Sequence, residues 1–126
     1  MKEHGHMATI CIVEDEPAIR DLVIEELEDC GHKVFPAVNG RDGLDVIIRE
    51  KPDLIISDIN MPEMNGFEMR ARLLRDHSDF ENTPFMFLSA FADRADIADG
   101  MVVGARAYLT KPIDFDLLIA WIDRLT

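Results

Sequence analysis

The sequence predicts an α/β fold in which a parallel β-sheet is covered by helices on both faces. Five short runs of apolar and β-branched residues occur along the chain, and each is followed by an amphipathic stretch. No low-complexity segment or internal linker interrupts this alternation, which is typical of a doubly wound sheet with right-handed crossovers. At 126 residues, the chain has the length of one domain.

The first strand and helix are predicted from Thr9 onward. Thr9–Val13 is an apolar run of the kind found in strands buried on both faces. Pro17 suits the first turn of a helix, and the acidic residues before it would be stabilised by the positive end of the helix dipole. Gly31 is expected to end this helix. The residues that recur at helical spacing are Ile19, Val23, Leu27 and Cys30, with Leu22 beside them.

The second strand is predicted over Lys33–Ala37. Asn39 and Gly40 then turn the chain into a helix, and Pro52 stops it. The apolar residues of that helix are Leu44, Ile47 and Ile48.

The third strand, Leu54–Ser57, runs directly into Asp58. The segment from Met61 to Gly66 holds a proline and a glycine, which predicts a loop. A helix should follow from Gly66 or Phe67 to His77, with one side formed by Phe67, Ala71 and Leu74.

Pro84 introduces the fourth strand, Phe85–Ser89. The helix expected over Ala92–Met101 is a weak one, because an interior Gly100 costs about 1 kcal/mol relative to alanine. Ala107–Leu109 is predicted as a short fifth strand, and Ile113–Leu125 as the last helix. The inward side of that helix should carry Phe115, Leu118, Ile119 and Ile122, whereas Leu117 and Trp121 fall off it and mark either a contact surface or partial burial.

The composition excludes several classes of protein. The chain is 48% apolar, which is too high for a disordered protein. Its 13 basic and 25 acidic residues give a net charge of −12, which argues against direct binding of nucleic acid or an anionic membrane. Cys11 and Cys30 are too few for a disulfide framework and are expected in the core or at a helix end.

The N-terminal segment 1–7, with His4 and His6, is expected to be a tag remnant or a disordered tail that precedes a domain over residues 8–126. No apolar run approaches the roughly 18 residues that a membrane helix needs, and no signal-peptide pattern is present. The expected location is therefore the cytoplasm.

Chemically active residues follow four of the predicted strands, at the sheet edge where folds of this class bind ligands. Glu14 and Asp15 follow the first strand, Asp58 follows the third, Ser89 ends the fourth, and Lys111 comes shortly after the fifth. Carboxylates brought so close together either raise a pKa or recruit a cation. Because the ligands are oxygens, the sequence favours Mg²⁺, with Mn²⁺ as the alternative, over Zn²⁺.

These residue types together suit a tetrahedral dianion. Asp58 is a candidate nucleophile toward phosphorus, as in enzymes that pass through an aspartyl phosphate. Lys111 and Ser89 would each hold a phosphoryl oxygen, and a backbone carbonyl near Asn60 would add a metal ligand.

Residues 8–126 resemble the receiver domain of two-component response regulators. The resemblance is carried by four motifs in order: Ile12–Pro17 (IVEDEP), Leu54–Pro62 (LIISDINMP, followed by Met64 and Gly66), Phe87–Ala90 (FLSA) and Tyr108–Pro112 (YLTKP). It implies a flavodoxin-like (βα)5 domain whose five-stranded parallel sheet has the order 2-1-3-4-5.

The resemblance also implies a role for each metal-binding and phosphate-binding residue. Asp58 matches the phosphoacceptor, which receives its phosphoryl group from a phosphohistidine of a histidine kinase or of a histidine phosphotransfer protein. Asp15 and Asp58 match direct Mg²⁺ ligands, Asn60 matches a ligand through its backbone carbonyl, and Glu14 matches an acid that acts through water. Lys111 matches the phosphate-binding lysine, and its bond to Pro112 resembles one that is usually cis.

In the same family, Ser89 and Tyr108 match a hydroxyl residue and an aromatic residue that change position when the acceptor is phosphorylated. Two departures are mild: Glu14 is longer than the aspartate that is common there, and Ser89 replaces the commoner threonine. The resemblance makes the protein a signalling domain that catalyses only its own phosphorylation and dephosphorylation. Its output face would comprise the fourth helix, fifth strand and fifth helix, and this face offers a surface for a homodimer.

Three alternatives remain open from the residues. A phosphorylation-independent interaction module of the same fold would not need the acid cluster or Lys111. A phosphohydrolase with an aspartyl nucleophile generally has an acid two residues after it, where this chain has Asn60. A flavin carrier needs a phosphate-binding loop after the first strand, and the acids at 14–16 would repel such a phosphate. The sequence fits both a stand-alone receiver and part of a larger regulator.

Overall fold

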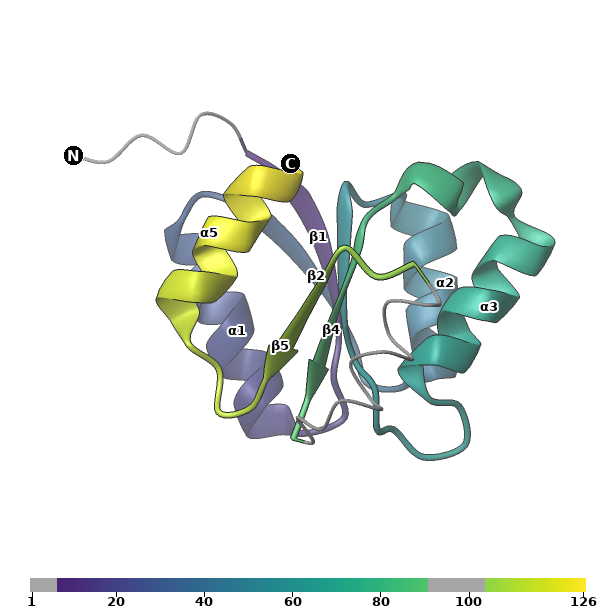
Figure 1. Cartoon of the computed structure of the whole chain (residues 1–126), viewed down its shortest axis with the longest axis horizontal. Helices are drawn as coiled ribbons and strands as arrows, with labels where there is room; N and C mark the ends of the chain where they lie inside the picture. Colours follow the sequence, from purple (N-terminus) through teal and green to yellow (C-terminus); the bar gives the residue numbers. More distant parts are fainter. Residues whose placement is uncertain (1–6, 91–103) are drawn as a thin grey trace.

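Strands and helices alternate along the described chain as far as Ser89, and a strand and a helix follow after the undescribed residues (Figure 1). The structure is a computed structural model, and it describes residues 7–90 and 104–126. The elements are β1 (Thr9–Val13), α1 (Pro17–Asp29), β2 (Lys33–Ala37), α2 (Gly40–Glu50), β3 (Leu54–Asp58), α3 (Gly66–Asp76), a short 3-10 helix η1 (Ser78–Asn82), β4 (Phe85–Ser89), β5 (Ala107–Thr110) and α5 (Phe115–Leu125).

The strands form one parallel sheet in the order β2-β1-β3-β4-β5, as predicted. Helices α1 and α5 cover one face of the sheet, and α2 and α3 cover the other (Figure 1). The predicted helix over Ala92–Met101 lies outside the described residues. None of the described helices is long and apolar enough to cross a membrane.

Each sheet face supports its own hydrophobic cluster, because successive side chains of a strand point to opposite faces. Cys11, Val13 and Phe87 belong to the cluster under α2 and α3. Ile10 and Ile12 belong to the cluster under α1 and α5. Burial on both faces explains why the strands read as continuous apolar runs rather than alternating ones.

Most predicted boundaries are confirmed, including the end of α1. Cys30 forms its C-cap and Gly31 follows with a φ of +93°, a conformation that favours glycine. Cys11 is buried and Cys30 lies at this helix end, as expected for both.

Several local predictions were wrong. Ala71 is exposed, and Met69 and Leu73 of α3 are buried instead, because the rotation of this helix turns them toward the sheet. Strand β3 extends to Asp58 rather than Ser57, because Asp58 still pairs with Leu88 of β4. Leu22, which the sequence places beside the periodic apolar residues of α1, is 45% exposed.

The other two concern the C-terminal elements. Helix α5 begins at Phe115 rather than Ile113, because the Asp114 side chain accepts a hydrogen bond from the Leu117 N–H at 3.2 Å and caps the helix there. Strand β5 extends to Thr110 rather than Leu109, because Thr110 still pairs with Ser89 of β4.

Gly66, the first residue of α3, permits a close approach of this helix to the end of β3. A Cβ at this position would lie 2.6 Å from the Asp58 carbonyl oxygen and 3.0 Å from the Phe87 ring. Backbone cannot move aside as a flexible side chain can, so only glycine fits here.

Gly66→Ala should therefore lower the free energy of unfolding by about 2 kcal/mol, through overpacking against the end of β3. Urea denaturation measures this change. Ala71→Ser, on the exposed side of the same helix, is the control and should change stability by less than about 0.5 kcal/mol. An equally small effect of Gly66→Ala would contradict the close packing.

Candidate functional site

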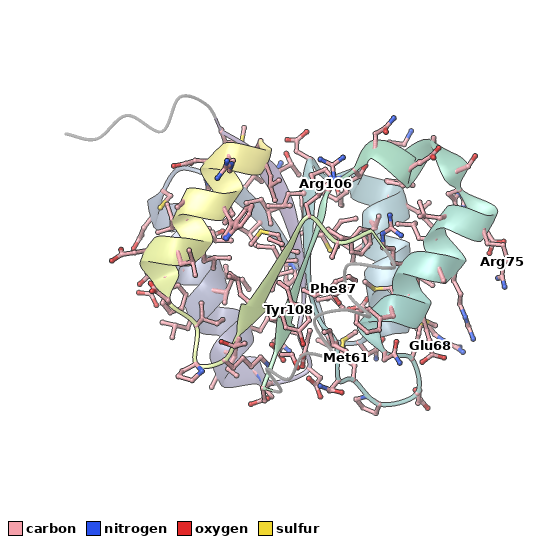
Figure 2. All side chains as sticks on the ribbon, in the orientation of Figure 1. Met61, Glu68, Arg75, Phe87, Arg106 and Tyr108 are labelled. Carbon is pink, nitrogen blue, oxygen red and sulfur yellow. The ribbon has the colours of Figure 1, made fainter. Side chains whose placement is uncertain are left out.

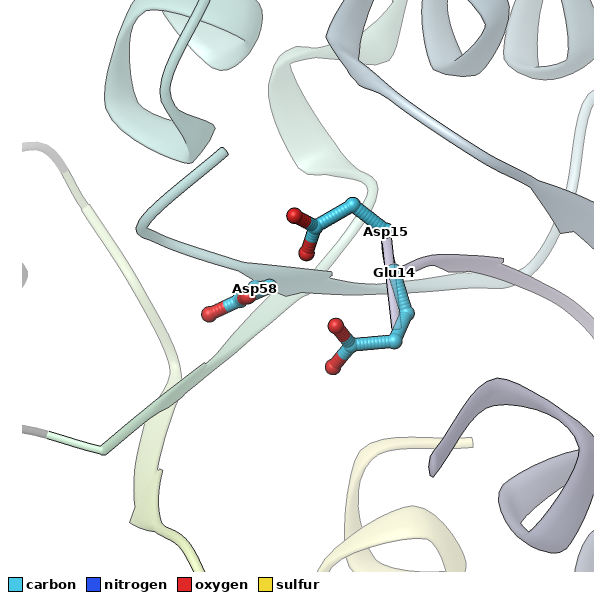
Figure 3. Close-up of side chains that lie close together, drawn as sticks. All are labelled: Glu14, Asp15 and Asp58. Atoms are coloured by element: carbon cyan, nitrogen blue, oxygen red, sulfur yellow. The ribbon is translucent and has the colours of Figure 1, made fainter. Parts of the chain in front are cut away.

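The sheet register brings three carboxylates together at the carboxyl ends of β1 and β3. Val13 pairs with Ser57, so Glu14 and Asp15 leave β1 beside Asp58. One oxygen from each carboxylate can be chosen so that all lie within 4.8 Å of one another (Figure 3). Glu14 is fully buried and Asp58 is 3% exposed, whereas Asp15 is half-buried. Three acids held so closely carry a strong mutual repulsion.

Lys111 is the cation that opposes this repulsion. Its Nζ lies 2.8 Å from Glu14 Oε1, 3.3 Å from Asp58 Oδ2 and 3.6 Å from Glu16 Oε1. The Lys111 backbone N–H donates to the Ser89 carbonyl at 2.7 Å, which continues the pairing of β4 with β5 beyond the end of the strand. The Lys111–Pro112 bond is cis, as the family resemblance implied.

The ionisation of these groups reflects both burial and their proximity. The pKa of Glu14 is raised to about 7. Burial is the main cause and the charge of Asp58 adds to it, whereas the hydrogen bond from Lys111 lowers the pKa. Burial also raises the pKa of Asp58, against the charge of Lys111, and Asp15 adds to the rise. Burial alone would lower the pKa of Lys111, but its contacts with Glu14 and Asp58 outweigh this effect and raise it.

Asn60 and Ser89 lie beside the acid cluster. The Asn60 backbone N–H donates to Asp58 Oδ1 at 3.3 Å, and its side-chain amide donates to Ser89 Oγ at 3.3 Å. Ser89 is buried at the end of β4.

Tyr108 lies on the edge strand β5, where it pairs with Phe87 of β4, two register positions before the pair of Ser89 and Thr110. Its ring is half-buried and packs against the cluster under α2 and α3. Figure 2 shows Tyr108 near Phe87, its partner on the neighbouring strand β4. The structure thus brings six of the seven predicted site residues into one connected cluster and places Tyr108 on the strand that leads to it.

Three residues that support the site were not singled out from the sequence as contributors. Arg20 donates through Nη1 to the Glu14 carbonyl at 2.8 Å, and Ser57 Oγ donates to the Asp58 carbonyl at 2.8 Å. Glu16 is exposed, and its Oε1 lies 3.6 Å from Lys111 Nζ. Arg20 stands one helical turn after Glu16, and this spacing was the signal that it could reach back to the strand end.

The residues present fit a divalent cation that prefers oxygen ligands. The described cluster offers three carboxylates and no sulfur or imidazole ligand, which matches Mg²⁺ or Mn²⁺ rather than Zn²⁺. One member, Asp15, is accessible from solvent, as an ion that retains several waters requires.

Fold and site together define a class of signalling domain, and comparison with known proteins shows the family. The model of the response regulator receiver domain matches residues 10–123. The chain belongs to this family.

Similar proteins differ in length. PilH of Pseudomonas aeruginosa is 38% identical over 117 residues, which cover 93% of this chain and 96% of PilH. The transcriptional regulator RpaA of Synechocystis is 39% identical over 90% of this chain, but the match covers 47% of RpaA. The sequence is thus similar both to nearly the whole of a short regulator and to about half of a longer one.

Solved structures agree with the sequence comparison. Vibrio cholerae CheY4 superimposes with a TM-score of 0.88 at 33% identity, over 96% of this chain and all of CheY4. The Thermotoga maritima response regulator TrrA, solved in complex with Mg²⁺–BeF, superimposes with a TM-score of 0.80 at 30% identity, over 94% of this chain and 98% of TrrA.

Asp15→Asn should stabilise the metal-free protein by about 1 kcal/mol, because it removes one of three mutually repelling charges. The same change should weaken stabilisation by Mg²⁺, which reaches about 2.7 kcal/mol at a concentration near 100 times the Kd of an intact site. Thermal unfolding with chelator and with Mg²⁺ measures both effects.

Asp21→Asn, at an exposed acid of α1, is the matched control and should produce neither effect. If Asp15→Asn destabilised the metal-free protein, or kept the full response to Mg²⁺, the cluster would not be a cation site.

Proposed function

We propose that this domain acts in the cytoplasm and accepts a phosphoryl group on Asp58 from a phosphohistidine of a histidine kinase or histidine phosphotransfer protein, in a Mg²⁺-dependent reaction. The observation that carries the proposal is the placement of a buried carboxylate, Asp58, within 3.3 Å of Lys111 Nζ and beside two further acids. Family membership and the Mg²⁺–BeF complex of TrrA support it.

The reaction needs one nucleophile and several groups that neutralise charge. A carboxylate oxygen of Asp58 forms the new O–P bond, while the P–N bond of the phosphohistidine breaks and the imidazole leaves. Lys111, already beside Asp58, pairs with a phosphoryl oxygen, and the Ser89 hydroxyl donates to another. The domain thereby catalyses its own modification and turns over no external substrate.

Asp15, Asp58 and the Asn60 carbonyl would hold Mg²⁺, with Glu14 acting through water, and Mn²⁺ is the alternative ion. When bound, the ion neutralises charge on the phosphoryl oxygens. Glu14 meanwhile keeps Lys111 in the site through the 2.8 Å ion pair. The chain's own residues thus supply the nucleophile, Asp58, and the ammonium group of Lys111, and they orient both.

Phosphorylation would act as a switch by favouring one of two pre-existing states. Ser89 would move toward the phosphoryl group, and Tyr108 would turn inward into the space that Ser89 leaves. Tyr108 stands on the edge strand β5, next to α5, so this movement would change the output face described from the sequence. That face would also receive a second copy in a homodimer; its fourth-helix part lies outside the described residues.

An apolar groove beside the site is suited to the protein that donates the phosphoryl group. It has a volume of about 230 Å³ and lies between α1 and the segment after β5. Lys111 is one of its lining residues and contacts Asp58, so a donor protein seated in the groove would lie beside the acceptor. The other lining residues are Ile19, Leu22, Pro112, Ile113 and Phe115.

Asp58→Asn should abolish phosphorylation, because the amide keeps the shape of the side chain but is not a nucleophile. Incubation with a phosphorylated donor protein and Mg²⁺, followed by mass mapping, measures the modification. Asp79→Asn, at an exposed acid of η1, is the control and should be labelled at the wild-type rate. Equal labelling of Asp58→Asn would exclude Asp58 as the acceptor, and undiminished transfer in chelator would exclude the metal.

Leu22→Glu should slow transfer from a donor protein by about tenfold, because it places a charge in an apolar contact. Phosphorylation by acetyl phosphate, which needs no docking surface, should change much less. Leu117→Glu is a matched control, since Leu117 is 46% exposed against 45% for Leu22 but lies on α5 outside the groove. Equal slowing with both donors would place the effect of Leu22→Glu in the reaction and not in docking.

A further inference from the structure

Asn60 makes two contacts that join the acceptor carboxylate to the switch hydroxyl. Its backbone N–H donates to Asp58 Oδ1 and its side-chain amide donates to Ser89 Oγ, each at 3.3 Å. Asn60 itself is exposed, whereas Asp58 and Ser89 are 3% and 1% exposed. An exposed side chain at the mouth of the pocket therefore holds a buried hydroxyl that comes from a different strand.

We propose that the Asn60 side chain is a positioning residue that holds Ser89 in its resting place and so opposes the switch. This inference rests on the proposed function, in which Ser89 moves toward a phosphoryl group on Asp58. In this inference, the Asn60 side chain sets the equilibrium between the two states before phosphorylation, while the Asn60 backbone carbonyl is expected to bind the metal.

The length of the contact makes it sensitive to that movement. Most N–H···O hydrogen bonds lie between about 2.7 and 3.2 Å. At 3.3 Å the Asn60–Ser89 bond is already long. We therefore expect the movement of Ser89 in the proposed switch to break it. An interaction that exists in only one of two states stabilises that state and lowers the apparent affinity of any ligand that needs the other.

The expected size of the effect is modest, because the Asn60 amide is exposed and can bond to water instead. Loss of such a bond should shift the equilibrium by about two- to fivefold. Asn60→Ala keeps the backbone N–H that binds Asp58 and the backbone carbonyl, and it leaves the net charge at −12. The substitution therefore removes the contact with Ser89 without altering the charge of the pocket.

The test is the affinity of the full chain for beryllofluoride, measured by Tyr108 and Trp121 fluorescence at saturating Mg²⁺, so that metal affinity does not enter the comparison. We expect Asn60→Ala to bind beryllofluoride about two- to fivefold more tightly than the wild type. Asn82→Ala, at an exposed asparagine of η1, is the matched control and should bind as the wild type does.

A double-mutant cycle with Ser89→Ala separates positioning from a general effect on the pocket. If Asn60 acts through the Ser89 hydroxyl, Asn60→Ala should have no effect when Ser89 is already alanine. Unchanged or weaker binding by Asn60→Ala, or a tightening that persists in the Ser89→Ala background, would overturn the inference. Failure of the wild type to bind beryllofluoride would overturn the proposed function itself, which is a different result.

Discussion

The structure depends on one electrostatic constraint: three carboxylates lie together beside the ammonium group of Lys111, the only one in contact with them among residues 7–90 and 104–126. Glu14 and Asp58 are buried, Asp15 lies beside them, and Lys111 contacts the two buried acids. One positive charge leaves the pocket with excess negative charge, and burial strengthens every interaction within it. Under the proposed function, the same imbalance that costs folding free energy would give the pocket its affinity for a divalent cation, and through it for a phosphoryl group.

The rest of the fold holds this costly arrangement in place. The register of β1 on β3 sets the separation of Glu14 from Asp58, and the continuation of β5 beside β4 delivers Lys111. Both faces of the sheet are buried, so the strands cannot slip without moving apolar side chains into water. Gly66 lets α3 pack on the carbonyl of Asp58, which fixes the loop that carries Asn60.

The sequence was sufficient for the strand order, through the family resemblance, and for the location of the site. Strand ends can be read from apolar runs, and residues at the carboxyl edge of a parallel sheet must lie together, which is why Asp15, Asp58 and Lys111 could be identified in advance. The individual side-chain contacts could not be predicted from the sequence. Nothing in the residue spacing shows that Lys111 lies closer to Glu14 than to Asp58. The burial of Met69 instead of Ala71 depends on how α3 is rotated against its neighbours, and periodicity fixes the spacing of a face without its direction.

The most direct test of the central claim is a crystal structure grown with Mg²⁺ and beryllofluoride. We expect one Mg²⁺ held by Asp15 and Asp58, with beryllofluoride bound to an oxygen of Asp58 and contacted by Lys111. A pocket that stays empty, with its carboxylates turned toward solvent, or beryllofluoride bound at any other residue, would contradict it.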